Sequence, residues 1–559
     1  RIERAVAMIS GDRQGRIWIA SEAQNLFCYD LKEQSLRNYI LTEHSLVSTN
    51  VKCLTVDNSG TIWIGFYGDG LFYSKDNLKT LHPYLSPVDN EETYNDDVVS
   101  KIVLGAYNCL YISSLKGGVK ELNLTSGKLR DLLLKDENNE AIYCRTLLVY
   151  TDNELWIGTE SGVYIYNLRT EKYTHLRSSE YDPYSLSDNA IYSFCKDRED
   201  GIWIGSYFGG VNYYPRSYTY FEKYYPKGEE NSLHGKRVRE FCRDSQGILW
   251  IGTEDGGLNR FNLKTKDFSF FAPSAGFTNI HGLCLVDDKL WVGTFSKGLK
   301  VIDTRSGVVL KTYQKNDSPR SLIDNSIFAI CKTATGDIYL GTMFGLVRYN
   351  KQSDDFDRIP ELNGKFIYDI KEDSAGNIWL ATYANGVYCY NVNDRKWKNY
   401  VHDDKDNTSL PYNKVSSVFE DSHRQIWLTT QGGGFCIFHP ESETITSYNS
   451  TNGLPSDVVY QIVEDKEGQL WLTTNNGLVC FQPNTEAMKV YTTANGLLGD
   501  QFNYRSSFED ENGMIYFGGI DGFIAFNPKD FSENKNLPTV VITDFLLFNK
   551  EVYADEPNS

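Results

Sequence analysis

Short apolar runs alternate with polar turns along the whole chain and recur every 40 to 48 residues. The clearest run, at 57–65, reads Asp-Asn-Ser-Gly-Thr-Ile-Trp-Ile-Gly, and close copies return at 197–205 and 244–252. Weaker copies carry an aromatic residue at the place of the tryptophan: Trp18, Tyr111, Trp156, Trp291, Tyr339, Trp379, Trp427, Trp471 and Tyr516. The 559 residues therefore contain twelve copies of one structural unit.

Each copy contains the signals of four short strands. The Asp and Gly of D-x-x-G suit a type I turn between two strands, and the Ile-Trp-Ile-Gly run suits a half-buried strand. An apolar run precedes the turn, and two more follow it, such as 162–166 and 268–271. Four strands in roughly 45 residues are typical of a β-propeller blade, whereas β-solenoids use shorter repeats with one strand per face.

Twelve blades exceed a single ring, because propellers usually have about four to eight blades. We predict an all-β chain with a first β-propeller at 1–219, a second at 220–535 and the start of a C-terminal β-sandwich at 536–559. The first range holds five repeats and the second seven, so two seven-bladed rings would leave the first incomplete in this chain. A division into six and six blades is the alternative, but it does not explain the abrupt start at Arg1.

The composition of the chain argues against several kinds of binding partner and of cysteine site. The net charge of −18 argues against binding nucleic acid or an anionic membrane through bulk charge. Because no run of 18 apolar residues exists, we expect no membrane-spanning helix in this segment. The 11 cysteines recur in strand registers without any C-x-x-C pair, so we expect most of them to be free and buried.

The sequence predicts no catalytic residue, metal site or cofactor. The eight histidines form no H-x-H or H-E-x-x-H spacing, and neither a G-x-S-x-G elbow nor a P-loop occurs. A propeller lyase would need a His/Glu acid–base pair on one face, and His281 is the only histidine within an inner-strand run.

Two parts of each blade are expected to reach the same face of a ring: the start of the innermost strand and the loop after the second strand. Counting eleven residues back from each motif aromatic gives one equivalent inner-strand position per blade. In the second ring these positions hold Arg239, Phe328, Tyr368, Ser416, Tyr460 and Arg505, with a less certain equivalent near His281; in the first they hold Ala7, Lys52, Ser100, Arg145 and Tyr192. Polar packing between neighbouring blades is the structural alternative to ligand binding.

Arginine forks suit carboxylate or sulfate, and tyrosine offers a flat apolar face to a sugar ring. Together with aromatic residues of the loops, this predicts a ligand-binding set: Arg239, Arg505, Tyr368, Tyr460, Tyr207, Phe208, Phe295 and Tyr383. Arg239 and Arg505 would belong to the first and last blades of a closed ring, hence to neighbours. Two adjacent guanidinium groups need an anion or acidic side chains between them, so an acidic sugar and an ion pair with glutamate both stay open.

The repeat resembles the two-component-regulator propeller repeat. The resemblance rests on D-x-x-G-x-I-W-I-G-T followed by Gly-Gly-Val-Asn at 209–212 or Gly-Gly-Leu-Asn at 256–259. The text at 517–528 resembles that family's terminal blade, and 538–549 resembles the first strand of the β-sandwich that follows it. Arrays of this repeat form the sensor regions of Bacteroides-type hybrid two-component systems.

The resemblance implies a periplasmic sensor region of an inner-membrane protein, with two seven-bladed propellers and a small sandwich. It also implies an oligosaccharide ligand from glycan breakdown, dimerisation through the sandwich, and a membrane helix and histidine kinase outside this chain. Twelve copies instead of fourteen depart from that pattern. A ligand-binding sensor is therefore the favoured function. A propeller lyase or hydrolase acting on a polysaccharide or small molecule, and a protein-interaction scaffold, are the alternatives.

Overall fold

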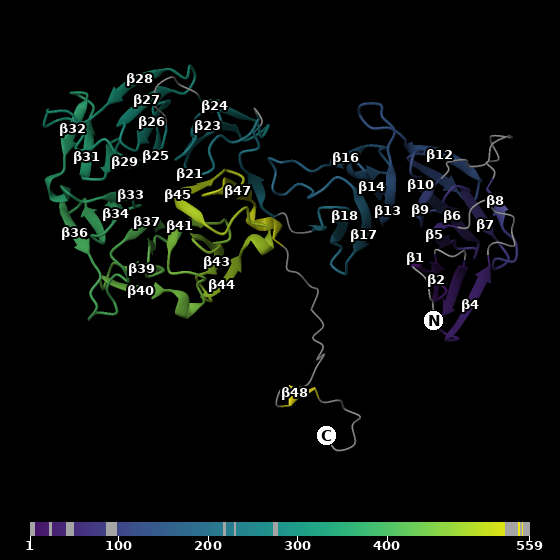
Figure 1. The fold of residues 1–559 in the computed structure, drawn as a ribbon. Helices are drawn as coiled ribbons and strands as arrows, with labels where there is room; N and C mark the ends of the chain where they lie inside the picture. Colours follow the sequence, from purple (N-terminus) through teal and green to yellow (C-terminus); the bar gives the residue numbers. More distant parts are fainter. Residues whose placement is uncertain are drawn as a thin grey trace. The chain divides into compact units, whose positions relative to one another are not determined.

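The computed structural model describes residues 6–21, 25–40, 50–84, 98–215, 220–228, 231–271, 278–531, 546–547 and 550–551. These residues form β-strands and short 3-10 helices without any α-helix, which confirms the predicted all-β class. The chain divides into two compact units, Arg1–Ser217 and Tyr218–Ser559 (Figure 1). Most of the predicted sandwich start at 536–559 lies outside the described residues, which include only a hairpin of β48 (Leu546–Leu547) and β49 (Lys550–Glu551).

The described residues of unit 1 form five antiparallel sheets, each built from consecutive strands of one repeat. Its blades are β1 (Val6–Gly11), β2 (Arg16–Ser21), β3 (Asn25–Asp30) and β4 (Ser35–Ile40); β5 (Val51–Val56), β6 (Ile62–Phe66), β7 (Leu71–Ser74) and β8 (His82–Pro83); β9 (Val99–Leu104), β10 (Cys109–Ser114), β11 (Val119–Asn123) and β12 (Lys128–Leu133); β13 (Cys144–Thr151), β14 (Glu154–Thr159), β15 (Gly162–Asn167) and β16 (Tyr173–Leu176); and β17 (Ile191–Lys196), β18 (Ile202–Ser206) and β19 (Val211–Tyr214).

Unit 2 contains seven four-stranded antiparallel sheets. Its first six blades are β21 (Val238–Arg243), β22 (Ile248–Thr253), β23 (Gly257–Asn262) and β24 (Phe268–Phe271); β25 (Ile280–Val286), β26 (Lys289–Thr294), β27 (Leu299–Asp303) and β28 (Val309–Tyr313); β29 (Ile327–Lys332), β30 (Ile338–Thr342), β31 (Gly345–Asn350) and β32 (Asp355–Arg358); β33 (Ile367–Glu372), β34 (Ile378–Thr382), β35 (Val387–Asn391) and β36 (Lys396–Tyr400); β37 (Val415–Glu420), β38 (Ile426–Thr430), β39 (Phe435–His439) and β40 (Thr444–Tyr448); and β41 (Val459–Glu464), β42 (Leu470–Thr474), β43 (Leu478–Gln482) and β44 (Ala487–Tyr491).

The seventh blade closes unit 2 into a ring. It joins β45 (Phe502–Glu509), β46 (Ile515–Gly519) and β47 (Phe523–Phe526) to β20 (Glu222–Tyr224) from the start of the unit. Tyr224 pairs with Phe523, and Glu222 with Ala525, so hydrogen bonds between the two ends of the unit hold the circle shut. The 3-10 helices η2 (Pro360–Leu362), η3 (Ser450–Asn452), η4 (Thr493–Asn495) and η5 (Pro528–Asp530) lie in connections.

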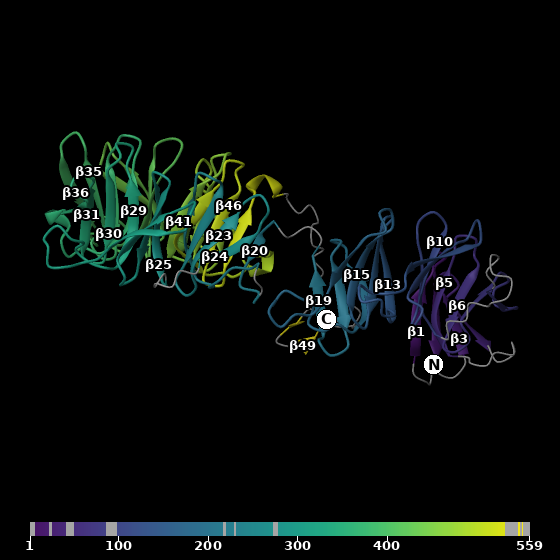
Figure 2. The ribbon, with the colours of Figure 1, turned by 90° about the horizontal axis from the view of Figure 1, so that it is seen from above.

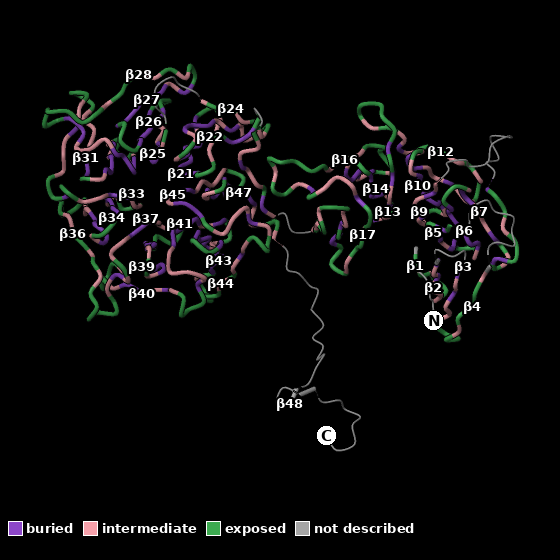
Figure 3. The backbone as a smooth tube through the Cα atoms, viewed as in Figure 1, coloured by how far each residue is buried: buried purple, intermediate pink, exposed green. Residues whose placement is uncertain are grey.

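The cores lie between neighbouring blades. In unit 2, seven clusters of buried apolar side chains join each blade to the next, including the seventh to the first. In unit 1, four such clusters join the five blades, so its described blades form an arc and not a ring. Figure 3 shows the buried strands inside each blade and the exposed turns at its rim, and Figure 2 shows the ring of unit 2 from its edge.

The aspartate of the motif has a second role besides its turn. Asp244 Oδ1 accepts hydrogen bonds from the backbone N–H groups of Gln246 and Ile248, and its Oδ2 accepts one from Trp250 Nε1 at 2.8 Å. Six other blades repeat this bond between motif Asp and Trp six residues later: Asp12–Trp18, Asp57–Trp63, Asp197–Trp203, Asp373–Trp379, Asp421–Trp427 and Asp465–Trp471. The six-residue spacing between this Asp and the Trp thus provides an acceptor for the indole N–H in all seven blades.

One motif tryptophan is not buried as the repeat predicts. The indole positions are equivalent in Trp63, Trp203, Trp250, Trp379, Trp427 and Trp471, and five of these are at most 6% exposed. Trp203 is 46% exposed, because it belongs to the last blade of the arc and no described blade covers its outer side. The prediction that all six are largely buried is therefore wrong for this end blade.

The cysteine prediction is confirmed. All 11 cysteines are free, and seven are buried. Cys195, on β17 of the last arc blade, is the one exposed thiol, for the same reason that Trp203 is exposed.

Candidate functional site

Every inner strand of the ring carries a β-bulge close to its start. In β21 the register of pairing with β22 shifts between Val238 and Glu240, so Arg239 is the extra residue of the bulge and has no partner in β22. The pairing register of the next five blades shifts at the same place. The residues left over are Arg239, His281, Phe328, Tyr368, Ser416 and Tyr460, and in β45 the irregular stretch contains Arg505. The eleven-residue count therefore found a real structural register, although in the blade of His281 it ends one residue before the bulge position, and bulges of this kind often re-aim side chains near binding sites.

The same bulge is present in unit 1. Its residues left over are Ala7, Lys52, Ser100, Arg145 and Tyr192. We call the face at which the inner strands begin the loop face, and the face that holds the D-x-x-G turns the turn face. Because the second strand runs antiparallel to the first, the loop after it returns to the loop face, as in the pairing of Ile367 with Thr382 just before Tyr383.

Aromatic rings join the inner strands of the ring at the loop face. Phe328 lies 4.5 Å from Phe366 between ring centroids, and Phe366 stacks on Tyr368 at 4.7 Å. Tyr504 stacks on Tyr368 at 5.7 Å and meets Tyr460 edge-on at 4.9 Å. The chain of contacts runs through the third, fourth, sixth and seventh blades and so reaches both sides of the ring.

Two aromatic residues of the loops extend this cluster into solvent. Phe295 lies 5.9 Å from the His281 ring and is 39% exposed, and Tyr383 stacks on Phe366 at 5.4 Å and is 42% exposed. Lys414 Nζ lies 4.3 Å from the centre of the Tyr383 ring. We call the seven rings that contact one another here the aromatic mouth: Phe295, Phe328, Phe366, Tyr368, Tyr383, Tyr460 and Tyr504.

Arg239 is buried next to this mouth. Its side chain is 1% exposed, and Nη1 donates a hydrogen bond to Asn503 Oδ1 at 3.3 Å and lies 3.7 Å from Glu254 Oε1. The guanidinium carbon lies 4.6 Å from the centre of the Tyr504 ring. Burial lowers the pKa of this arginine, and its Nε atom has no hydrogen-bond partner among the described residues.

Arg505 crosses from the seventh blade to three others. Its Nε lies 2.9 Å from Asp369 Oδ1 in the fourth blade, and its Nη1 lies 3.7 Å from Glu240 Oε2 in the first. Nη1 also donates to the Phe328 carbonyl at 2.9 Å in the third blade. The backbone of Arg505 is left-handed, with φ of 49°, a strained conformation that the bulge imposes.

The two arginines do lie on neighbouring blades, and acidic side chains accompany them. Glu240 and Asp369 surround Arg505, and Glu254 faces Arg239. Of the two alternatives that the sequence left open, the structure therefore shows the ion pair with acidic side chains. Contact between either arginine and a ligand stays a prediction.

The predicted site residues fall into two groups. Arg239, Arg505, Tyr368, Tyr460, Phe295 and Tyr383 come together at the loop face of unit 2. Tyr207 and Phe208 belong to unit 1, where Tyr207 stacks on Tyr192 at 5.1 Å and Phe208 lies against it. Their rings are 59% and 88% exposed, on the last blade of the arc.

Sequence reasoning missed several residues of the aromatic mouth and its surroundings. Phe366 precedes the counted position by two residues, and Tyr504 adjoins Arg505 within the longer bulge of β45. Asp369 and Glu240 each follow a counted residue directly, so a count that kept two consecutive positions would have found both carboxylates.

Polar atoms at the bulge positions lack partners within the described part of the chain. They are Arg239 Nε, His281 Nδ1 and Ser416 Oγ. His281 Nε2 bonds to the Asn279 side chain at 2.7 Å, and burial lowers the pKa of His281 so that the ring is neutral. Buried polar groups nearly always form hydrogen bonds to protein, water or ligand, so these atoms are suited to a polar guest at the mouth.

Burial raises the pKa of Glu240 from 4.5 to about 7, although Arg505 and Arg239 oppose the shift. Between these values the folded protein binds more protons at Glu240 than the unfolded chain does, so this residue makes the free energy of unfolding fall as pH rises through the window. We expect Glu240→Gln to flatten that dependence in denaturant titrations from pH 4.5 to 7. Glu420, which is only half-buried and accepts a hydrogen bond from Ser374, provides the control Glu420→Gln. Identical slopes for wild type and Glu240→Gln would contradict the assignment.

Segments of this chain match a known family of repeats, and some of them contain residues of the aromatic mouth. The two-component regulator propeller family matches residues 185–208, 232–255, 361–384 and 453–476. The chain carries two-component regulator propeller repeats. Two of the matched segments, 361–384 and 453–476, contain Phe366, Tyr368, Tyr383 and Tyr460, so the repeat itself places much of the aromatic mouth.

Relatives of the repeat chain include a histidine kinase P4 from Formosa agariphila, 27% identical over 291 residues, which are 49% of this chain and 21% of the relative. The chain thus spans about a fifth of the length of that curated relative. A solved extracellular domain from B. thetaiotaomicron, described as part of a hybrid two-component system, is 24% identical, with a TM-score of 0.74 over 96% of this chain and 77% of that one. This likeness confirms the propeller fold.

A solved virginiamycin B lyase from Staphylococcus aureus is 14% identical, with a TM-score of 0.43 over 55% of this chain and 97% of that one. That similarity is too low to say anything of the chemistry of this chain. Among the described residues, no helix is long and apolar enough to cross a membrane, and no group of three or more His, Cys, Asp or Glu side chains could hold a metal ion.

Proposed function

We propose that this chain is the ligand-binding sensor region of a hybrid two-component system and that the aromatic mouth of unit 2 receives an oligosaccharide from glycan breakdown. The observation that carries the proposal is the mouth itself. Exposed rings of Phe295 and Tyr383 continue inward into buried rings and into polar atoms that lack partners. Sugar rings pack their apolar faces on such aromatic side chains and place hydroxyl groups at polar atoms beside them.

The closed ring supports a binding role for this face. Seven interblade cores fix the inner strands, so the bulge residues and loops are held on a rigid frame before any ligand arrives. Preorganised side chains lose less freedom on binding, which favours affinity. An acidic sugar stays part of the proposal, because Lys414 lies beside Tyr383 at the exposed edge of the mouth.

The remaining parts of the proposal rest on the repeat and its relatives. We infer a periplasmic location within an inner-membrane protein, a homodimer of the whole protein, and a signal passed to a histidine kinase outside this chain. The described residues give no sign of an acid–base pair at His281, whose partner is the Asn279 amide. A lyase or hydrolase and an interaction scaffold are outcomes that the experiments below distinguish.

Replacing Tyr383 by alanine should weaken binding of a recognised oligosaccharide about tenfold, because an exposed aromatic anchor is lost while the buried core stays intact. Isothermal titration calorimetry on wild type and variant measures this change. Val392→Ala is the matched control, since Val392 is exposed in the same blade and lies in the turn between β35 and β36 on the turn face. Equal affinity of wild type and Tyr383→Ala, with Val392→Ala also unchanged, would remove the aromatic mouth as the binding site.

A further inference from the structure

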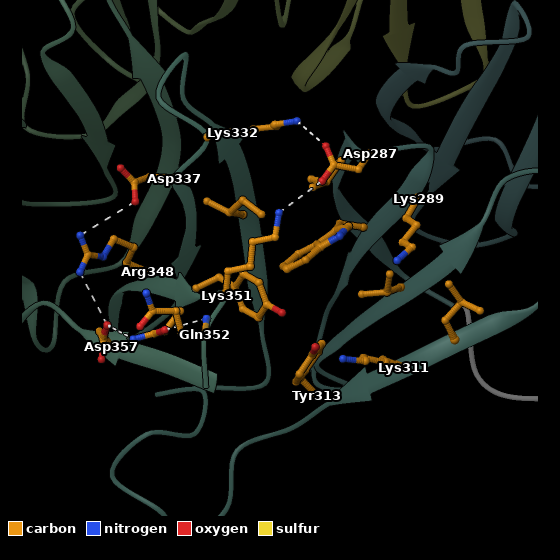
Figure 4. Close-up of a pocket in the computed structure, with 18 residues that line it drawn as sticks. Asp287, Lys289, Lys311, Tyr313, Lys332, Asp337, Arg348, Lys351, Gln352 and Asp357 are labelled. Atoms are coloured by element: carbon orange, nitrogen blue, oxygen red, sulfur yellow. Dashed lines mark hydrogen bonds and ion pairs between the residues drawn. The ribbon is translucent and has the colours of Figure 1, made fainter. Parts of the chain in front are cut away.

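A cavity lies on the turn face of unit 2, between the second and third blades. Its volume is about 590 Å³, within the roughly 300–1,000 Å³ of typical small-molecule sites. Trp291, Tyr313 and Tyr349 contribute its aromatic wall. Figure 4 shows Lys289 and Lys311 on one side of this cavity, and Arg348 and Lys351 on the other.

The turn between the first two strands of the second blade is shortened. Strands β25 and β26 are joined by Asp287 and Asp288 alone, both with positive φ, whereas β21 and β22 are joined by the four residues 244–247. The shorter turn lacks the D-x-x-G segment, whose aspartate accepts the indole N–H in seven other blades.

The indole N–H of Trp291 has no acceptor among the described residues. Trp291 Nε1 makes no hydrogen bond to any described residue and is not itself fully buried, although the residue as a whole is only 4% exposed. The blade of Trp156 has an equally short turn, and there Glu154, two residues before the tryptophan, accepts from Trp156 Nε1 at 2.7 Å. The equivalent residue before Trp291 is Lys289, so a second donor stands where the other blade has its acceptor.

The basic side chains that line the cavity outnumber the acidic ones, although Lys311 is paired with Asp354, which lies outside the lining. Five basic and three acidic side chains line it, in a chain whose net charge is −18. Lys332 and Lys351 share Asp287 at 3.0 and 4.0 Å, and Arg348 lies 4.0 Å from Asp337 and 3.6 Å from Asp357. Among the described residues, the side chain of Lys289 forms no hydrogen bond or ion pair, although, after Lys332 and Lys351, its charge helps to lower the pKa of Asp287.

We propose that this cavity is a second binding site, for a small molecule that bears a carboxylate or sulfate group. An oxygen of that group accepts the indole N–H of Trp291 and the ammonium of Lys289, and Arg348 and Lys351 complete the positive rim. Charge-assisted hydrogen bonds of this kind are the strong ones in proteins. The inference does not depend on sugar binding at the aromatic mouth, which lies on the opposite face of the ring.

The indole N–H resonances of ¹⁵N-tryptophan-labelled protein test the proposal directly. Trp291→Phe assigns the Trp291 signal, and Trp250, whose N–H is already bound by Asp244, serves as the internal reference. Glucuronate and inorganic sulfate are the probes, with glucose and potassium chloride of equal ionic strength as controls. We expect a saturable shift of the Trp291 signal with at least one anionic probe, and none with the controls.

Two variants distinguish anion binding at this specific site from a general effect of ionic strength. Lys289→Ala should weaken the anion about tenfold, as for loss of one charged hydrogen bond. Lys289→Glu should abolish anion binding and shift the Trp291 signal by itself, because the new carboxylate takes the place that Glu154 has beside Trp156. Tighter binding of glucuronate than of sulfate would identify an organic acid as the ligand, and the reverse an inorganic anion. No shift with either anion, the same shift with potassium chloride, or unchanged affinity in Lys289→Ala would overturn the proposal.

Discussion

Trp250→Ala should lower the free energy of unfolding of unit 2 by about 3–5 kcal/mol, whereas Trp203→Ala should change the stability of unit 1 by about 1 kcal/mol or less. Both residues occupy the same place in near-identical motifs, and both donate to the motif aspartate, at 2.8 and 3.1 Å. Only Trp250 is enclosed between two blades, so only its removal leaves a large cavity and takes the donor away from a buried Asp244 Oδ2.

Chemical denaturation of each variant, followed by fluorescence and circular dichroism, measures this difference. Because the two tryptophans lie in similar motifs, a difference between the two variants reports the effect of burial and not of local sequence. Similar losses in the two variants would mean that the described arc does not represent the environment of Trp203 in solution.

Arg505→Ala should destabilise unit 2 by about 3–5 kcal/mol, because it leaves Glu240 and Asp369 buried without their cation. It also removes the hydrogen bond to the Phe328 carbonyl, one of the contacts that cross the ring from the seventh blade. Combining Arg505→Ala with Glu240→Gln and Asp369→Asn should recover much of the loss, since the unpaired charges are then gone.

Equilibrium unfolding at neutral pH distinguishes this structural role from a role in ligand contact. Arg239→Ala is the companion variant, because the Arg239 side chain is even more buried than that of Arg505, at 1% against 12% exposed, but faces the partly exposed Glu254. A loss below about 1 kcal/mol for Arg505→Ala would show that the ion pairs contribute little. If Arg505→Ala is fully folded but binds an acidic oligosaccharide more weakly than wild type, Arg505 contacts the ligand.

The sequence predicts repeats and registers well because each blade is a local unit with the same internal spacing. The motif tryptophan, the turn before it and the bulge position eleven residues earlier all lie within one hairpin, so their geometry follows from short-range pairing. In the blade with the shorter turn the count ends at Ile280, one residue before the bulge position His281.

Contacts between distant parts of the chain could not be predicted in this way. Strand β20 has three residues, too few for a periodic signal, and it is recognised only by its pairing with β47. The partners of Arg505 come from three other blades, and the exposure of Trp203 depends on the absence of a covering blade among those described. Such features are set by ring closure, which the pattern of a single repeat does not contain.

Titration of the purified chain with oligosaccharides from glycan breakdown, with chromatography of the recovered sugar, tests the central claim most directly. The account predicts saturable heat with at least one oligosaccharide, recovery of that sugar unchanged, and about tenfold weaker binding in Tyr383→Ala. Formation of a new product would instead indicate a lyase or hydrolase. Absence of heat with every glycan, together with stable binding of a protein partner, would indicate a scaffold and contradict the sensor assignment.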